Sequence, residues 1–357
     1  MAYTTINKST TYFNTVLYTG NGGTQNITGV GFQPDFIWGK TRADNAGSGQ
    51  TDHILTDVVR GAGKNIFSDR DVSERTNANR HSGFLTDGFS VGNDGQVNTN
   101  SNTYVAWNWK AGGSGSANTA GYTASTVSAN TTAGFSIVKW TGTGSATTVG
   151  HGLGVAPTWI MVKNLADDND WFVYTKAIGY FMSNPDPETD YLKLNQINGR
   201  QDEINAWNDT SPTSNVFTVG SASNVNGSSD PMIAYCFTDK PGYCDIGHYY
   251  GNGAGSSDGA FVYTGFKPKF VMIKIITENN NWNMIDNKRP GFNEIDQRLF
   301  PNLDNAEQDG TCALDFLSNG FKARNNNDNY NKSNASYVYL AFGQTIVGSN
   351  NIPATAR

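Results

Sequence analysis

Three stretches of the sequence share one pattern, in which an apolar run follows a proline and ends in a lysine. They read GFQPDFIWGK at 31–40, GVAPTWIMVK at 154–163 and GFKPKFVMIK at 265–274. An aromatic-x-Gly-x-Gly motif precedes each of them, at 18–22, 140–144 and 249–253. Because both motifs occur three times in the same order, the sequence indicates an internal duplication with a period of roughly 100 residues.

The similarity continues downstream of each lysine. FLTDGF at 84–89 matches FLSNGF at 316–321, and Asp-Gly or Asn-Gly between apolar residues favours a tight hairpin. The middle copy has lost this turn and keeps only VFTVG at 216–220. An aromatic strand closes each copy, and we align the strands by their alanines: Ala106 within 104–109, Ala234 within 232–237 and Ala341 within 337–342.

These patterns predict strands throughout. The run after each proline is apolar on both faces, which indicates a central strand covered on both sides. The closing strands alternate more clearly, as half-exposed strands do. The 357 residues include 40 glycines, and charged residues make up only 16%, which is typical of short strands joined by turns. The sequence therefore predicts an all-β fold of three tandem, diverged β-sandwich repeats, jelly-roll or lectin-like.

The repeat also sets the predicted domain boundaries. Residues 111–133 are mostly Gly, Ser, Ala, Thr and Asn, a composition typical of a flexible linker. The junction between the second and third copies is short, so these two should pack directly against each other. We expect an N-terminal arm at 1–11, sandwiches at 12–110, 134–240 and 241–347, a linker at 111–133 and a C-terminal tail at 348–357.

Residues that could carry catalysis are few. None of the histidines at 53, 81, 151 and 248 lies in a catalytic motif, and His53 occupies the slot held by Trp171 and Trp282 in the other copies. A polysaccharide depolymerase would need two carboxylates in one cleft, and no motif marks such a pair. We predict no enzymatic activity and no catalytic residues.

An acid–base pair recurs at equal spacing, as Asp57 with Arg60 and as Asp286 with Arg289. Such a pair could form a repeated binding site, but an ion pair that braces a turn is the interpretation we favour. The lysine that ends each proline-initiated strand should reach water or pair locally.

Metal and redox sites have little support. The runs at 167–170 and 325–329 are rich in the oxygen ligands that calcium prefers, but neither has the spacing of an EF-hand. Cys236 and Cys244 flank a Pro-Gly turn and could pair across strands, although we favour three buried, reduced thiols. We expect no cofactor and no metal, with calcium as the alternative that these runs leave open.

Contacts with a partner are expected from loops. Residues 180–212 interrupt the repeat pattern as an insertion, and insertions on rigid scaffolds often carry function. Aromatic side chains in exposed loops could stack on sugar rings. The candidate contact residues are Tyr180, Tyr191, Trp207 and Tyr330.

Charge and hydropathy exclude several partners. The net charge is −6 and no basic stripe is present, so we expect no nucleic-acid binding. No stretch approaches the roughly 18 apolar residues of a membrane span, so we expect no membrane insertion. Residues 1–8 lack the pattern of a signal peptide, which predicts synthesis in a host cytoplasm without export.

The repeated blocks resemble a family of uncharacterised repeat domains in tail-fibre and other virion proteins of phages, particularly marine phages and cyanophages. LDFLSNGFK at 314–322 and YVAWNWKAGG at 104–113 carry most of the likeness, which covers roughly residues 12–345. The resemblance implies a virion structural protein, a tail-fibre, spike or receptor-attachment component that contacts other virion proteins and a host-surface glycan. The alternatives are a capsid decoration protein, a lectin-like glycan-binding module and a depolymerase. We expect a homotrimer or a pseudo-trimeric monomer.

Overall fold

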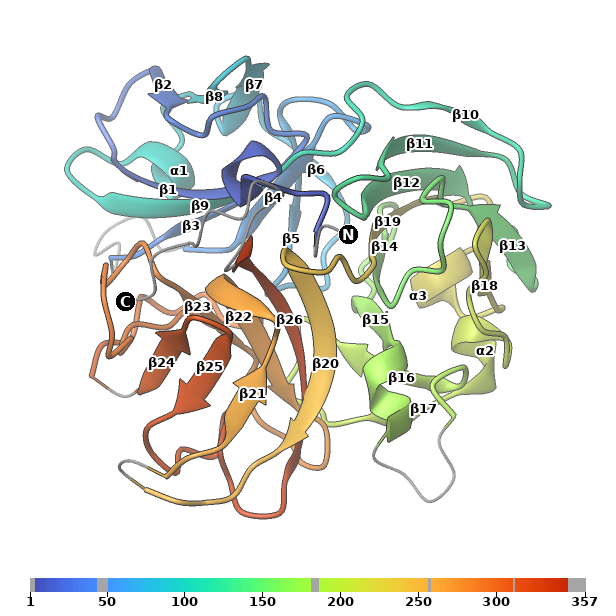
Figure 1. Cartoon of the computed structure of the whole chain (residues 1–357). Coiled ribbons are helices and arrows are strands. Elements are labelled where there is room, and N and C mark those ends of the chain that lie inside the picture. The colour runs from blue at the N-terminus through green and yellow to red at the C-terminus, as the bar shows by residue number, and fades with distance from the viewer. Residues whose placement is uncertain (1–3, 44–50, 181–185, 256–257, 311, 346–357) are drawn as a thin grey trace.

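The computed structural model describes residues 4–43, 51–180, 186–255, 258–310 and 312–345. It confirms an all-β sandwich fold. The strands form three lobes around a common centre, coloured blue to cyan, green to yellow, and orange to red in Figure 1. We call these lobes the first, second and third unit.

The first unit has a larger and a smaller antiparallel sheet. Its elements are η1 (Ser9–Thr11), β1 (Phe13–Thr19), β2 (Gln25–Thr28), β3 (Phe36–Thr41), β4 (Ile54–Asp57), β5 (Lys64–Phe67), β6 (Arg75–Thr76), β7 (His81–Leu85), β8 (Gly88–Val91), α1 (Gly95–Asn98) and β9 (Thr103–Trp109). The larger sheet has the order β1-β9-β3-β4-β5-β6, and the smaller sheet has the order β2-β8-β7.

The second unit has a longer main sheet and a two-stranded partner. Its elements are β10 (Ser116–Asn118), β11 (Ser125–Asn130), β12 (Phe135–Thr141), β13 (Thr147–Gly150), β14 (Trp159–Asn164), β15 (Phe172–Thr175), η2 (Lys176–Tyr180), β16 (Asp190–Lys193), β17 (Gln201–Asp202), α2 (Ile204–Trp207), β18 (Val216–Val219), α3 (Ser223–Asn226) and β19 (Pro231–Phe237). The sheets are β10-β11-β12-β19-β14-β15-β16-β17 and β13-β18.

The third unit has sheets of four and three strands. Its elements are β20 (Cys244–Tyr250), β21 (Phe261–Tyr263), β22 (Phe266–Ile275), β23 (Asn283–Asp286), β24 (Leu314–Leu317), β25 (Gly320–Ala323) and β26 (Ser336–Thr345). The sheets are β20-β26-β22-β23 and β21-β25-β24.

The three main sheets share one topology. The closing strand of each unit lies between the first strand and the proline-initiated strand, giving β1-β9-β3, β12-β19-β14 and β20-β26-β22. The prediction that the proline-initiated strands are central and covered on both faces is confirmed, because every residue of β3 and β14 is buried. The prediction that the closing strands are half-exposed is wrong, since they too are central and almost all of their residues are buried.

The strand register corrects the alignment of the third closing strand. Gly39 lies opposite Ala106 and Val162 lies opposite Ala234. The equivalent residue Ile273 lies opposite Tyr339, whereas Ala341 pairs two residues further along. The alanine in the third copy is therefore not equivalent to the other two. A match of residue type misled the alignment, and the distance to the lysine gives the correct register.

Each unit has its own sandwich core between its two sheets. Val16, Ile27 and Phe89 belong to that of the first unit, Val138, Val149 and Phe217 to that of the second, and Val271, Val262 and Phe321 to that of the third. Such interdigitating inner faces are the usual source of sandwich stability.

A fourth core lies at the centre of the molecule and draws on all three units. The opposite face of each main sheet supplies it, with Trp109 and Phe36 from the first unit, Phe237 from the second and Phe342 from the third. The ring of Trp109 lies within 6.3 Å of Phe237 and 5.7 Å of Phe342, centroid to centroid. The three units therefore pack around one shared core and are not separate bodies along the chain.

The prediction of a flexible linker at 111–133 is wrong. Residues 125–130 form β11, which pairs with β12 along its full length, and β10 pairs with β11 in turn. Small and β-branched residues suit this edge of the second main sheet as well as they suit a linker, so composition alone could not separate the two. The N-terminal segment also packs, since Ile6 enters the central core. The tail at 348–357 lies outside the described residues.

Candidate functional site

Of the four aromatic residues expected to contact a partner, one is exposed and three are buried. Tyr180 is 60% exposed and stacks on His248 at 4.6 Å between ring centroids. Tyr191, Trp207 and Tyr330 are buried, so the expectation that they lie exposed in loops is wrong. Trp207 donates from Nε1 to the Asp190 carbonyl, and such satisfied indoles are typical of a core.

Residues 180–212 are only partly an insertion, and 181–185 lie outside the described residues. Within the rest, β16 and β17 occupy the places of β5 and β6, at the same edge of the main sheet. The helix α2 has no equivalent among the described residues of the other two units. It packs beside β18, where the first unit has the hairpin of β7 and β8. The loss of the Asp-Gly turn in the second unit thus coincides with a helix that replaces a strand.

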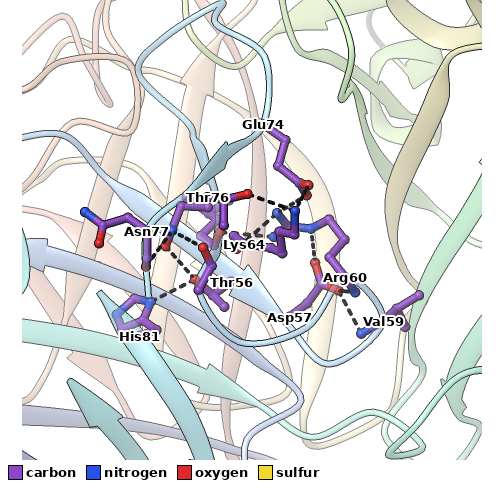
Figure 2. Close-up of polar contacts among 12 residues, drawn as sticks. Thr56, Asp57, Val59, Arg60, Lys64, Glu74, Thr76, Asn77 and His81 are labelled. Atoms are coloured by element: carbon purple, nitrogen blue, oxygen red, sulfur yellow. Dashed lines mark hydrogen bonds and ion pairs between the residues drawn. The ribbon is translucent and has the colours of Figure 1, made fainter. Parts of the chain in front are cut away.

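The pair Asp57 and Arg60 is the centre of a buried charged cluster (Figure 2). Arg60 Nε donates to Asp57 Oδ2 at 2.5 Å and Nη1 contacts Glu74 Oε2 at 3.2 Å. Tyr235 of the second unit donates its hydroxyl to Asp57 Oδ2 at 2.7 Å. Burial alone would lower the pKa of Arg60, but the negative charges of Asp57 and Glu74 raise it, so the guanidinium stays charged.

The third unit repeats this cluster with one change of partner. Arg289 Nε donates to Asp286 Oδ2 at 2.7 Å, and Nη1 contacts Glu307 at 3.0 Å. The neighbouring unit now supplies Trp107, which donates from Nε1 to Asp286 at 3.0 Å. The prediction of an ion pair bracing a turn agrees with this geometry, because each aspartate also accepts from backbone N–H groups two and three residues later.

The second unit has no charge at these positions. The strand register places Thr175 opposite Trp159, as Asp57 lies opposite Phe36 and Asp286 opposite Phe270. Ile178, three residues later, stands where the other units have arginine, and it packs in the central core. The fold therefore accepts either a buried ion pair or an apolar replacement at this point.

The three repeat lysines are buried at the boundaries between units. Lys163 Nζ donates to the Asp71 carbonyl of the first unit at 2.6 Å and also to the Asn169 carbonyl. Lys274 Nζ donates to the Ile197 carbonyl of the second unit at 2.8 Å. Lys40 Nζ donates to the Asp304 carbonyl of the third unit at 3.2 Å. Each unit thus reaches the next, and the three contacts close a ring.

Burial changes the titration of two of these lysines. It lowers the pKa of Lys274 to about 7. It also lowers the pKa of Lys163 to about 8, although nearby aspartates, first among them Asp71, favour the charged form. The prediction that these lysines pair locally holds only in part, because the partner carbonyls come from neighbouring units as well as from nearby residues.

The Trp–His slot makes a second ring of contacts. Trp171 Nε1 donates to the Phe67 carbonyl of the first unit at 2.7 Å, and Trp282 Nε1 donates to the Lys193 carbonyl of the second at 2.9 Å. His53 occupies the slot in the first unit, where the Phe300 backbone of the third unit lies close enough to influence its pKa, and Nε2 has no hydrogen-bond partner among the described residues. Burial lowers the pKa of His53 well below its usual value, so its imidazole is neutral.

The Gly-x-Gly motifs hold the turn before each closing strand. A buried asparagine side chain accepts from the middle residue of each motif: Asn98 from Asn21, Asn226 from Thr143 and Asn331 from Asn252. A Cβ atom on Gly251 would lie 2.2 Å from the Lys332 carbonyl oxygen, and the same approach occurs at Gly20 and Gly142. Only glycine allows this contact.

The remaining candidate ligands serve structural roles. Asp170 accepts from Asn195 at 2.7 Å and pairs with Lys193, and Asn327 accepts from backbone N–H groups in its own loop. Cys236, Cys244 and Cys312 are free and buried, and burial raises the pKa of Cys312 to about 12. Among the described residues, no cluster of three His, Cys, Asp or Glu side chains is arranged to hold a metal ion.

The sequence matches a known family of domains. Residues 8–345 match the domain of unknown function DUF7483. The chain belongs to this family. No curated protein matches the sequence. Within the part of the chain that the structure describes, no helix is long and apolar enough to cross a membrane. The DUF7483 match extends from just before β1 to the end of β26, so all three units lie within one domain of this family.

Proposed function

We propose that this DUF7483 chain is a non-catalytic structural component of a bacteriophage virion, in a tail fibre, spike or receptor-attachment assembly. The observation that carries the proposal is the use of the recurring polar residues. Asp57, Arg60, Asp286 and Arg289, together with the lysines of all three copies, are buried and bound to groups of the chain itself. Side chains committed in this way brace a scaffold, and the sequence resemblance supplies the virion context.

The closed arrangement suits a particle component exposed to solvent and shear. The inter-unit contacts form rings, so no unit can leave without breaking contacts to both neighbours. The shared aromatic core has the same effect, because each unit packs against both of the others there. Such a body is expected to be rigid and to resist proteolysis, because local opening requires loss of buried contacts.

The test is the protein composition of purified particles. Mass spectrometry of density-gradient-purified virions from the phage that encodes this chain should detect it at a stoichiometry typical of structural proteins. Its absence from particles, with abundant chain in the infected-cell lysate, would contradict the proposal. Cryo-electron microscopy of the particle would then distinguish tail attachment from capsid decoration.

One observation favours glycan binding as a second function. Phe261 and Tyr263 point outward from the edge strand β21, with 47% and 62% exposure, while Val262 between them is buried. The equivalent outward positions, set by the pairing of Val262 with Phe321, hold Asn26 and Thr28 in the first unit and Thr148 and Gly150 in the second. Aromatic pairs on an exposed face often mark binding surfaces.

A glycan array with the wild-type chain and a Phe261→Ala, Tyr263→Ala variant tests this second function. We expect the double variant to lose binding, while Tyr122→Ala, which removes an exposed aromatic ring from the second unit, retains it. Equal binding by all three proteins would show that β21 does not contact glycans.

A further inference from the structure

A cavity of about 250 Å³ lies at the outer edge of the first main sheet. It is lined by residues of β5, of the loop from β5 to β6, of β6 and of the turn that leads into β7, together with Asp52. Three of the lining side chains are arginines: Arg70, Arg75 and Arg80. This concentration of positive charge is unusual in a chain with a net charge of −6. Because like charges repel, a cluster of this kind needs a compensating group.

Acidic side chains compensate the cluster only in part. Arg70 Nη1 pairs with Asp52 at 3.1 Å and Arg80 Nε pairs with Asp94 at 3.3 Å. Arg75 has no ion pair among the described residues, and Glu74 beside it is taken by Arg60 and Lys64. The cavity therefore keeps a surplus positive charge.

Packing restrains two of the guanidinium groups. The Phe67 ring lies beneath Arg80 at 5.2 Å and beneath Arg70 at 6.0 Å, measured to the ring centroid. Contacts over an aromatic face orient a guanidinium and leave its N–H groups free to bind along the edge. The cavity thus has a flat aromatic floor and donors arranged around it.

The other two units show that the fold does not require Arg70 or Arg75. Arg75 lies opposite Asn65, and the equivalent pairs are Tyr191 with Gln201 and Arg298 with Gln308. Glutamine therefore replaces Arg75 in both other units. Arg70, three residues after Phe67, corresponds to Gln196 after Lys193 and to Leu303 after Phe300. The charges of Arg70 and Arg75 are therefore not repeated in the other units, although Arg298 of the third unit lies over the ring of Phe300, the equivalent of Phe67.

We infer that this cavity binds an oxyanion carried by a saccharide, such as the carboxylate of a uronic acid residue. The guanidinium fork matches the geometry of carboxylate, sulfate and phosphate groups. The cavity is smaller than the roughly 300–1,000 Å³ that enclose a drug-sized ligand, so it suits one charged sugar of a longer chain. The inference rests on the proposed attachment function, for which an acidic surface polysaccharide is a suitable partner.

Calorimetric titration of the full chain with a glucuronic acid-containing tetrasaccharide tests the inference. We expect binding that inorganic phosphate displaces, that weakens with added salt and that a neutral tetrasaccharide does not reproduce. The Arg70→Gln, Arg75→Gln variant should bind at least tenfold more weakly. It introduces the residue that the second unit carries at both positions, so it should fold normally by circular dichroism. Arg324→Gln, which removes one positive charge from the ion pair with Asp315 in the third unit, should bind like wild type.

Three outcomes would overturn the inference. The first is that the acidic tetrasaccharide does not bind. The second is that inorganic phosphate binds but does not displace the tetrasaccharide. The third is that Arg324→Gln weakens tetrasaccharide binding as much as the Arg70→Gln, Arg75→Gln variant does. The particle composition test is independent of this one. Detection of the chain in virions together with absent anion binding would remove the cavity assignment and leave the structural role in place.

Discussion

At the scale of single residues, the molecule depends on polar side chains buried between units. Lys274 is fully buried and donates to Ile197 at 2.8 Å and to Asn280 at 2.5 Å, both through carbonyl oxygens. A buried ammonium is costly, but so is a buried carbonyl without a donor. The balance between these costs shifts with pH, which makes the lysine contacts measurable.

We predict that Lys274 makes stability rise with pH. Its pKa is about 7 in the folded chain and near its usual, higher value when unfolded, so above pH 7 the unfolded chain binds more protons. Stability should therefore increase with pH until the unfolded lysine also titrates. Between pH 7 and pH 9 the free energy of unfolding of the wild type, relative to that of Lys274→Met, should increase by about 2 kcal/mol. Urea unfolding at both pH values measures it, and a pH-independent difference would contradict the prediction.

The ion pair Asp286–Arg289 gives a second residue-scale prediction. Removing one partner leaves a buried charge, so Arg289→Ile or Asp286→Thr alone should destabilise the chain by about 3–5 kcal/mol. The double variant carries the residues that the second unit has at Thr175 and Ile178, and it should recover most of this loss. Glu307 keeps Arg42 as a partner at 2.8 Å. Chemical denaturation of the three variants measures the coupling, and additive losses would show that the pair is not a unit.

At the scale of elements, each closing strand is positioned by the Gly-x-Gly motif of its own unit. In the third unit, Gly253 donates its N–H to the Asn331 carbonyl at 3.0 Å, and Gly251 donates to the Ala335 carbonyl at 2.9 Å. Asn331 Oδ1 accepts from Asn252 between them. These contacts fix the turn before β26, and β26 pairs with β20 and β22 on either side.

We therefore predict that Gly251→Ala destabilises the chain by about 2–3 kcal/mol, because the added methyl group would overlap a backbone oxygen. Gly255→Ala is the matched control, since nothing lies within 4 Å of the added Cβ and its φ is ordinary. Thermal unfolding of both variants compares them. Equal melting temperatures would mean that the turn adjusts freely and does not position β26.

At the scale of the whole molecule, the central core makes the three units interdependent. Trp109 contacts Phe13 and Phe36 of its own unit as well as rings of both other units. Trp140, in contrast, lies in the sandwich core of the second unit and packs against Phe217. Trp109 therefore probes the core shared by all three units, and Trp140 probes the sandwich core of the second unit alone.

We predict that Trp109→Ala lowers the unfolding free energy by about 3–5 kcal/mol and increases hydrogen exchange in β3, β14 and β22 alike. Trp140→Ala should increase exchange mainly in the second unit. Calorimetry of wild type should give one cooperative transition. Three separate transitions, or an effect of Trp109→Ala confined to the first unit, would show that the units behave as independent domains.

The repeat, the all-β class and the central position of the proline-initiated strands could be predicted from the sequence alone, because they follow from local patterns of apolar residues, glycine and proline. The sequence also favoured an ion pair over a ligand site for Asp57 and Arg60. The strand at 125–130, the burial of Tyr191, Trp207 and Tyr330 and the lysine contacts between units are visible only in the folded chain. These properties depend on contacts between residues far apart in the chain, which no local pattern records. The arginine cavity has the same origin, since its charges become significant only when the sheet edge brings them together.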